Sequence, residues 1–250
     1  MKVVRTLALL CCLVALARFA DRAVDSSVAA SARSHSPATV TAAPQEDNKL
    51  VYADFETVKD NRPWSNRGGF VQLTANQERP TLKSYFKGQE GANPPAPEVV
   101  RIKKDDPNRA ITFDFEMQAL NEWADVSVEV HGQPDKDGKP VADDVSAYKF
   151  FTAQIYAIGL TSLRVEFISK SNGIEMSAGY PQMFVKISPG FNTYRIPLKG
   201  VAQPSWAEVK VNPKDVLKNL TMVRVRAYCG GPCIAMKGTV VIDNMIFQNQ

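Results

Sequence analysis

Short segments in which apolar and polar side chains alternate recur along most of this chain. Residues 111–117 place Ile, Phe, Phe and Met at alternate positions against Thr, Asp and Glu, and residues 126–131 repeat the pattern with three valines. A period of two is typical of a strand with one buried side and one polar side. Further strands are predicted at residues 147–157, 162–169, 182–187, 192–198, 221–228 and 234–247.

Residues that favour turns separate these segments. They occur at Gly159, Asn172-Gly173, Pro189-Gly190 and Lys199-Gly200, and a longer loop rich in Pro and Asp is predicted at residues 133–141. Only residues 213–217 have the pattern of a single helical turn. Regularly spaced short strands without intervening helices predict an all-β fold, an antiparallel sandwich rather than a series of βαβ units.

Acidic side chains stand in the apolar pattern at both ends of this strand-rich region. Asp54 and Glu56 flank Phe55 near its start, and Asp243 lies within the apolar run 240–247 at its end. We predict that both segments are strands, so that Asp54 and Glu56 share one face. The first and last strands of a sandwich can meet at one edge, where their carboxylates would suit a structural cation. Alternatively, these acids are solvated or paired with Lys and Arg.

The N-terminal segment has the pattern of a signal peptide. Lys2 and Arg5 precede an apolar run, residues 7–16, that is too short to span a bilayer, and small residues follow at 15–17. We predict a signal peptide at residues 1–17, a mature chain without a membrane span, and a secreted or periplasmic location. A mitochondrial leader is the alternative, although such leaders are amphipathic rather than continuously apolar.

The segment after the leader differs in composition from the rest of the chain. Residues 18–47 are mostly Ala, Ser, Thr and Pro, which cannot bury enough surface to offset the entropy of ordering. We predict a disordered tether there and one β-sandwich domain at residues 48–250, a length that can hold a full core.

Two of the four cysteines fall in the predicted leader, which leaves Cys229 and Cys233. In an exported protein this spacing favours a small disulfide loop. A zinc site needs about four ligands, and His131 is the only His after the tether.

The charge of the chain argues against nucleic acid as a partner. The net charge is +4, and loss of residues 1–17 removes two positive charges and leaves +2. No basic stripe interleaved with aromatic residues is present, so phosphate recognition is not predicted.

Polar side chains recur on three of the predicted strands and give a candidate ligand-binding face. They are Gln154 and Tyr156, Arg164 and Glu166, and Arg224 and Arg226. If these strands are neighbours, the side chains share one sheet face. Guanidinium forks suit carboxylates, so an acidic sugar or charged polymer is the favoured ligand. The alternative is a cross-strand ladder of Arg–Glu pairs on a solvated face.

The tryptophans allow two interpretations. Trp123 lies in a predicted turn and Trp206 in a predicted loop, where an exposed ring could stack on a sugar. Trp64 follows a proline near the first strand and is expected to pack in the core or at an edge. Rings that close the end of a sandwich are the alternative for the two loop residues.

Five segments together resemble carbohydrate-binding modules of jelly-roll type. They are Asp54-Phe55-Glu56, Trp64, and residues 144–148, 191–198 and 241–247, and the resemblance spans residues 50–248. The chain is also similar to the complex I intermediate-associated proteins, which have galactose-binding-like sandwiches. The resemblance implies a jelly roll and a structural calcium ion that ties the first strand to the last, with Asp54, Glu56 and Asp243 at the matching positions.

The resemblance also implies non-catalytic binding of a polysaccharide or glycoconjugate. A protein–protein scaffold or assembly factor on the same fold is the alternative. A polysaccharide-active enzyme, a lyase or hydrolase, comes third: Asp114 and Glu116 would lie about 7 Å apart on one strand face, but a Ser-His-Asp or Cys-His site would have to use His131.

Overall fold

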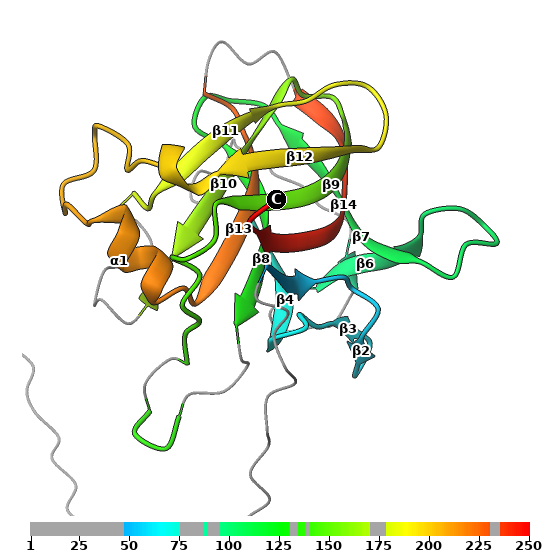
Figure 1. Ribbon diagram of the computed structural model, residues 1–250. Coiled ribbons are helices and arrows are strands. Elements are labelled where there is room, and N and C mark those ends of the chain that lie inside the picture. Colours follow the sequence, from blue (N-terminus) through cyan, green and yellow to red (C-terminus); the bar gives the residue numbers. More distant parts are fainter. Residues whose placement is uncertain are drawn as a thin grey trace, which may run out of the picture. The chain divides into compact units, whose positions relative to one another are not determined.

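The protein is an antiparallel jelly-roll β-sandwich, shown in Figure 1 as a computed structural model. The structure describes residues 48–75, 88–89, 96–130, 135–138, 141–170, 179–230 and 236–250. The predicted leader and tether, His131 and Cys233 lie outside these residues, so the predictions about them stay predictions.

Two sheets make up the sandwich (Figure 1). The seven-stranded sheet has the order β12 (Asn192–Pro197), β9 (Phe150–Ile158), β14 (Met236–Gln248), β7 (Arg109–Met117), β6 (Ala96–Arg101) and β5 (Gly88–Gln89), and β1 (Lys49–Ala53) also pairs with β14. The five-stranded sheet has the order β11 (Gln182–Lys186), β10 (Ser162–Ile168), β13 (Met222–Tyr228), β8 (Trp123–Val130) and β4 (Gly68–Ala75). Smaller elements are β2 (Val58–Lys59), β3 (Arg62–Pro63), the 3-10 turn η2 (Leu198–Gly200) and α1 (Pro213–Lys218).

The core confirms the predicted alternation. In β7, Ile111, Phe113, Phe115 and Met117 are buried, whereas Asp114 and Glu116 on the other side are partly exposed. The single helical turn predicted at residues 213–217 is confirmed as α1, which begins at Pro213. Its N-cap residue, Asn212, accepts a hydrogen bond from the Lys214 N–H at 3.0 Å, and proline is favoured in the first turn because it needs no N–H partner there.

The first and last strands meet, as predicted. β1 runs antiparallel to β14, with Leu50 opposite Phe247 and Lys49 opposite Gln248. β14 also pairs with β9 and β7, so the C-terminal strand (orange to red in Figure 1) lies in the middle of its sheet. The prediction that residues 54–56 continue the first strand is wrong. Phe55 has a φ of 57°, in the left-handed region, and β1 ends at Ala53.

Candidate binding face of the five-stranded sheet

The outer face of the five-stranded sheet carries a polar lattice on three adjacent strands. Alternation in β10, β13 and β8 turns one set of side chains to the core and the other set outward. The pairing register aligns the outward residues in two rows: Arg164, Arg226 and Asp125 form one, and Glu166, Arg224 and Ser127 form the other. Residues from chain segments about a hundred positions apart therefore meet on one face.

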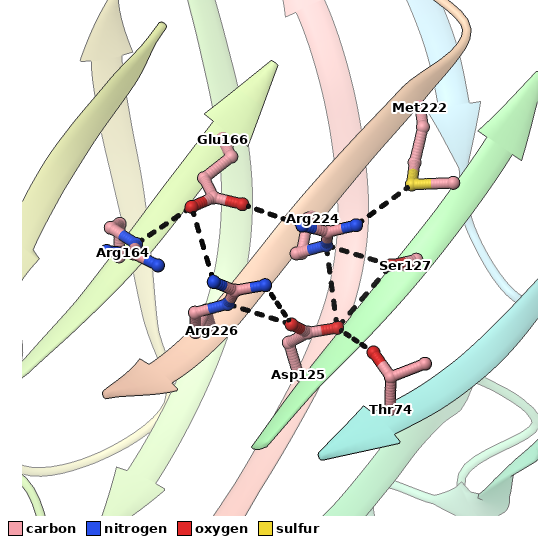
Figure 2. Close-up of polar contacts among 8 residues, drawn as sticks. All are labelled: Thr74, Asp125, Ser127, Arg164, Glu166, Met222, Arg224 and Arg226. Carbon is pink, nitrogen blue, oxygen red and sulfur yellow. Dashed lines mark hydrogen bonds and ion pairs between the residues drawn. The ribbon is translucent and has the colours of Figure 1, made fainter. Parts of the chain in front are cut away.

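Asp125 is the carboxylate that holds two of the arginines in this lattice (Figure 2). Its Oδ2 lies 2.8 Å from Nε and 2.7 Å from Nη2 of Arg226. Its Oδ1 lies 3.5 Å from Nε of Arg224 and accepts a hydrogen bond from the Thr74 hydroxyl at 2.6 Å. These contacts join β4, β8 and β13 through side chains as well as through the backbone.

Glu166 closes the lattice from the other side (Figure 2). Its Oε2 accepts a hydrogen bond from Nη1 of Arg224 at 3.1 Å, and its Oε1 lies 2.9 Å from Nε of Arg164. The Arg164 Nε–H is not aligned for a hydrogen bond, so this last contact is an ion pair only. Arg224 also donates a hydrogen bond to the Ser127 hydroxyl at 3.2 Å.

The lattice is buried and carries an excess of positive charge. The side chains of Asp125 and Arg224 are 0% and 2% exposed, and the others are at most 11% exposed. Three guanidinium groups face two carboxylates. Burial lowers the pKa of Arg164; the charge of Glu166 opposes this effect, and the charge of Arg226 adds to it. The ladder of Arg–Glu pairs therefore exists, but on a buried face rather than a solvated one.

Aromatic rings border the lattice. The guanidinium of Arg226 lies 4.2 Å from the ring centre of Trp123, and that of Arg164 lies 4.6 Å from the ring centre of Tyr228. Phe184, which is opposite Arg164 in the register, is 55% exposed. Cation–π stacking on the two guanidinium groups stabilises the orientations of the Trp123 and Tyr228 rings.

Trp206 is a further exposed ring, on the loop between η2 and α1. It is 61% exposed. A Cβ added to Gly179 would lie 3.0 Å from a carbon of the Trp206 ring, so the ring packs against the chain that leads into β11. Trp64, by contrast, packs edge-on against Phe70, with the two ring centres 6.5 Å apart, in agreement with the predicted packing role.

The structure brings together four of the six residues predicted for ligand binding: Arg164, Glu166, Arg224 and Arg226. The expectation that Gln154 and Tyr156 share their face is wrong, because β9 belongs to the seven-stranded sheet. The chain passes from that sheet to the other at Gly159, whose φ is +82° and whose added Cβ would lie 1.9 Å from the Lys237 carbonyl oxygen.

Sequence reasoning missed Asp125 and Ser127 as members of the lattice. The strand predicted at residues 126–131 begins one residue after Asp125, and its polar side chains were not assigned to the candidate face. The signal was present, because Asp125 stands two positions before Ser127 and so faces the same side.

The acids predicted to bind a cation lie near the junction of β1 and β14. Asp243 is fully buried, and its Oδ2 accepts hydrogen bonds from the side-chain amides of Asn108 and Asn244, both at 2.8 Å. Burial raises the pKa of Asp243 to about 6, and the charges of Glu56 and Asp54 add to this effect. The charges of Glu56 and Asp54 therefore act on the Asp243 carboxyl.

The same acids already have protein donors. The Glu56 carboxylate accepts a hydrogen bond from the Arg109 N–H at 2.6 Å, and Asp54 accepts one from the Asn66 amide at 2.8 Å. Within the described ranges, no three His, Cys, Asp or Glu side chains are grouped closely enough to hold a metal ion. The calcium site stays a prediction. So does the disulfide of Cys229, which is buried, because Cys233 is outside the described residues.

Comparisons with known proteins find similar structures but no matching sequence. No protein-family model and no curated protein matches the chain. A family 11 carbohydrate-binding module from Clostridium thermocellum, solved in complex with a β-1,3-1,4-mixed-linked tetrasaccharide, is 13% identical with a TM-score of 0.48, over 81% of this chain and 96% of that one. A family 30 carbohydrate-binding module of a cellulosomal cellulase from the same organism is 10% identical, with a TM-score of 0.41, over 71% and 98%.

Part of a larger enzyme is also similar. A β-1,2-glucanase from Parabacteroides distasonis is 12% identical with a TM-score of 0.40, and the match covers 81% of this chain and 24% of that one. At these identities the likeness identifies no ligand for this chain. None of the helices in the described ranges is long and apolar enough to cross a membrane.

Proposed function

We propose that this chain is an exported, non-catalytic module that binds a polysaccharide or glycoconjugate on the outer face of its five-stranded sheet. The observation that carries this proposal is the buried lattice of three arginines and two carboxylates on that face, bordered by aromatic rings. Replacement of a buried ionic cluster by well-packed apolar side chains is often neutral or stabilising, since burying ions costs desolvation. Stability alone therefore does not account for this lattice, and a role in recognition is the one that we propose for it.

The exposed rings and the buried charges have different parts in this proposal. Phe184 and Trp206 are exposed enough to stack on the C–H faces of sugar rings. The lattice beneath holds Trp123 and Tyr228 in fixed orientations and gives the face an excess of positive charge. That excess favours uronic or sulfated sugars over neutral ones, as expected for guanidinium groups.

Affinity electrophoresis tests the proposal with gels that contain polygalacturonate, an acidic polymer, or mixed-linkage β-glucan, a neutral one. We expect stronger retardation by the acidic polymer. Phe184→Ala and Trp206→Ala should each weaken retardation about three- to tenfold, because loss of a stacked ring removes roughly 1 kcal/mol. Both rings are largely exposed, so the melting temperature should stay near that of the unmodified protein.

Phe191→Ala is the matched control, because Phe191 is also exposed but precedes β12 in the other sheet. Its retardation should equal that of the unmodified protein. Free migration through every gel would overturn the proposal. It would favour the scaffold alternative, for which the exposed apolar side chains of Trp206 and Val209 would be the first surface to test.

We also propose a structural calcium ion at Asp54, Glu56 and Asp243. Its support is the raised pKa of the buried Asp243, to which the charges of Glu56 and Asp54 contribute and which a cation would lower. To admit the ion, the three carboxylates would have to move closer together and the amides of Asn108 and Asn244 would have to turn. At a free calcium concentration of about a hundred times the dissociation constant, binding adds about 2.7 kcal/mol to the free energy of unfolding. This raises the melting temperature of a domain of this size by roughly 5–10 °C.

Thermal melting in calcium and in chelator measures this effect. We expect the difference to disappear in Asp243→Asn and to persist in Asp114→Asn, which changes an acid on the outer face of β7. Identical melting curves of the unmodified protein in calcium and in chelator would refute the ion, and they would leave the polysaccharide proposal intact.

A further inference from the structure

A cavity of about 730 Å³ shares no lining residue with the polar lattice. Its walls come from the segment that leads into β9, the turn η2 after β12, and the start of α1, which is labelled in Figure 1. This volume is within the range of small-molecule sites, which span roughly 300–1,000 Å³.

Hydrogen bonds of the backbone fix the walls relative to one another. The Leu198 N–H donates to the Lys149 carbonyl oxygen at 2.9 Å, and the Val145 N–H donates to the Leu217 carbonyl oxygen at 2.8 Å. Phe150 and Pro197 are opposite each other in the β9–β12 register. The cavity is therefore formed by the fold itself, and a ligand would find it already assembled.

The lining combines an apolar interior with a positive rim. Tyr148, Leu198 and Leu217 are buried side chains of the walls. Lys149, Lys199 and Lys214 are exposed at the rim, and in the described part of the chain no Asp or Glu lines the cavity and no ion pair engages these lysines. Arg195 adds another positive charge next to it, with its guanidinium 3.6 Å from the ring centre of Phe150.

The chemistry of this lining differs from that of a sugar site. Sugar hydroxyls need several polar partners, and apart from the lysines only Ser146, Asn212 and the hydroxyl of the buried Tyr148 supply polar side-chain groups to this lining. An apolar body is favoured inside the cavity by burial, and an anionic head is favoured at the rim by the uncompensated lysines. We propose that the cavity binds a small amphiphilic anion: a carboxylate, sulfate or phosphate head on an alkyl or aromatic body.

Calorimetric titration of the full chain with laurate, below its micelle concentration, tests this site. We expect saturable binding, and about tenfold weaker binding of Lys199→Gln/Lys214→Gln, since each exposed ion pair contributes up to about 1 kcal/mol. Lys186→Gln changes an exposed lysine of β11 outside the cavity and should bind as the unmodified protein does. Ala147→Trp, at an exposed position of the lining, should abolish binding by filling the apolar space.

Two further ligands separate the contribution of the head from that of the body. Dodecyl maltoside has the same alkyl length with a neutral head and should bind at least about tenfold more weakly than laurate; acetate has the head alone and should not bind. Equal binding of the maltoside, competition by acetate at laurate concentrations, or an unchanged affinity in the double lysine variant would overturn the proposal. Phe184→Ala should leave laurate binding unchanged, because this site is independent of the polysaccharide face.

Discussion

Replacing Asp125 with Ala should lower the free energy of unfolding by about 3–5 kcal/mol, the cost of removing one partner from a buried ion pair. Asp125 is fully buried and contacts both Arg224 and Arg226, and its contact with Arg226, at 2.7 Å, is closer than the 3.7 Å contact that Glu166 makes with the same guanidinium. Without it, the three guanidinium groups of the buried lattice keep Glu166 as their one carboxylate among the lattice residues. The excess of positive charge in the lattice therefore rises from one unit to two.

Urea unfolding followed by tryptophan fluorescence measures this loss. The matched control is Asp114→Ala, which removes a half-buried carboxylate that accepts a single hydrogen bond from the Thr239 hydroxyl at 2.6 Å. The control should lose about 1 kcal/mol. The double variant Asp125→Ala/Arg226→Ala should lose less than the sum of the two single variants, since it removes a charge together with its partner. Equal losses in Asp125→Ala and Asp114→Ala would contradict the structural role of the lattice.

This expectation changes how the arginines can be used to study binding. From the sequence, Arg164→Ala and Arg226→Ala are expected to weaken ligand binding with little effect on stability. The structure shows side chains that are at most 11% exposed and paired with buried acids, so both variants should also be destabilised. Phe184 and Trp206 are better probes of the ligand, because their rings can be removed without leaving an unpaired buried charge.

The alternation of side chains predicts strands well because it records which face of a strand is buried. It identified β7 with the four large apolar residues of its core-facing side, and it placed Arg164 and Glu166 on one face and Arg224 and Arg226 on one face. It does not record the sheet to which a strand belongs. β9 alternates as β10 does, and the turn at Gly159 carries the same signal whether the chain returns along its own sheet or crosses to the other. The grouping of Gln154 and Tyr156 with the arginines failed for this reason.

The sequence also could not predict that these charged side chains are buried. A charged residue at the polar positions of an alternating strand is ordinarily solvent-facing. Asp125 is buried because Thr74, Arg224 and Arg226 surround it, and these partners come from strands that are distant in the chain. The prediction of a strand at residues 54–56 was wrong for a local reason. The Asp54 side chain accepts a hydrogen bond from the Glu56 N–H at 3.1 Å, and this bond closes a turn where the alternation suggests a strand.

The second large effect is expected in the core, where Phe247→Ala should lower the free energy of unfolding by about 3–5 kcal/mol. The Phe247 ring lies 5.0 Å from Phe151 and 5.6 Å from Tyr52, measured between ring centres, and both belong to its own sheet. It also lies 6.2 Å from Phe167 of the opposite sheet. Truncation would therefore leave a cavity between the two sheets and remove edge and tilted ring contacts at the same time.

Urea unfolding again measures the loss, with two variants that bracket it. Phe247→Leu keeps most of the apolar volume and should lose clearly less than the alanine variant, whereas Phe191→Ala removes an exposed ring and should lose about 0.5 kcal/mol or less. Phe247 is also 6.2 Å from Tyr148, which lines the cavity beside η2 and α1. Because that contact supports one wall of the cavity, laurate binding should weaken in Phe247→Ala but not in Phe191→Ala. A Phe247→Ala protein as stable as Phe191→Ala would mean that the C-terminal strand does not close the core.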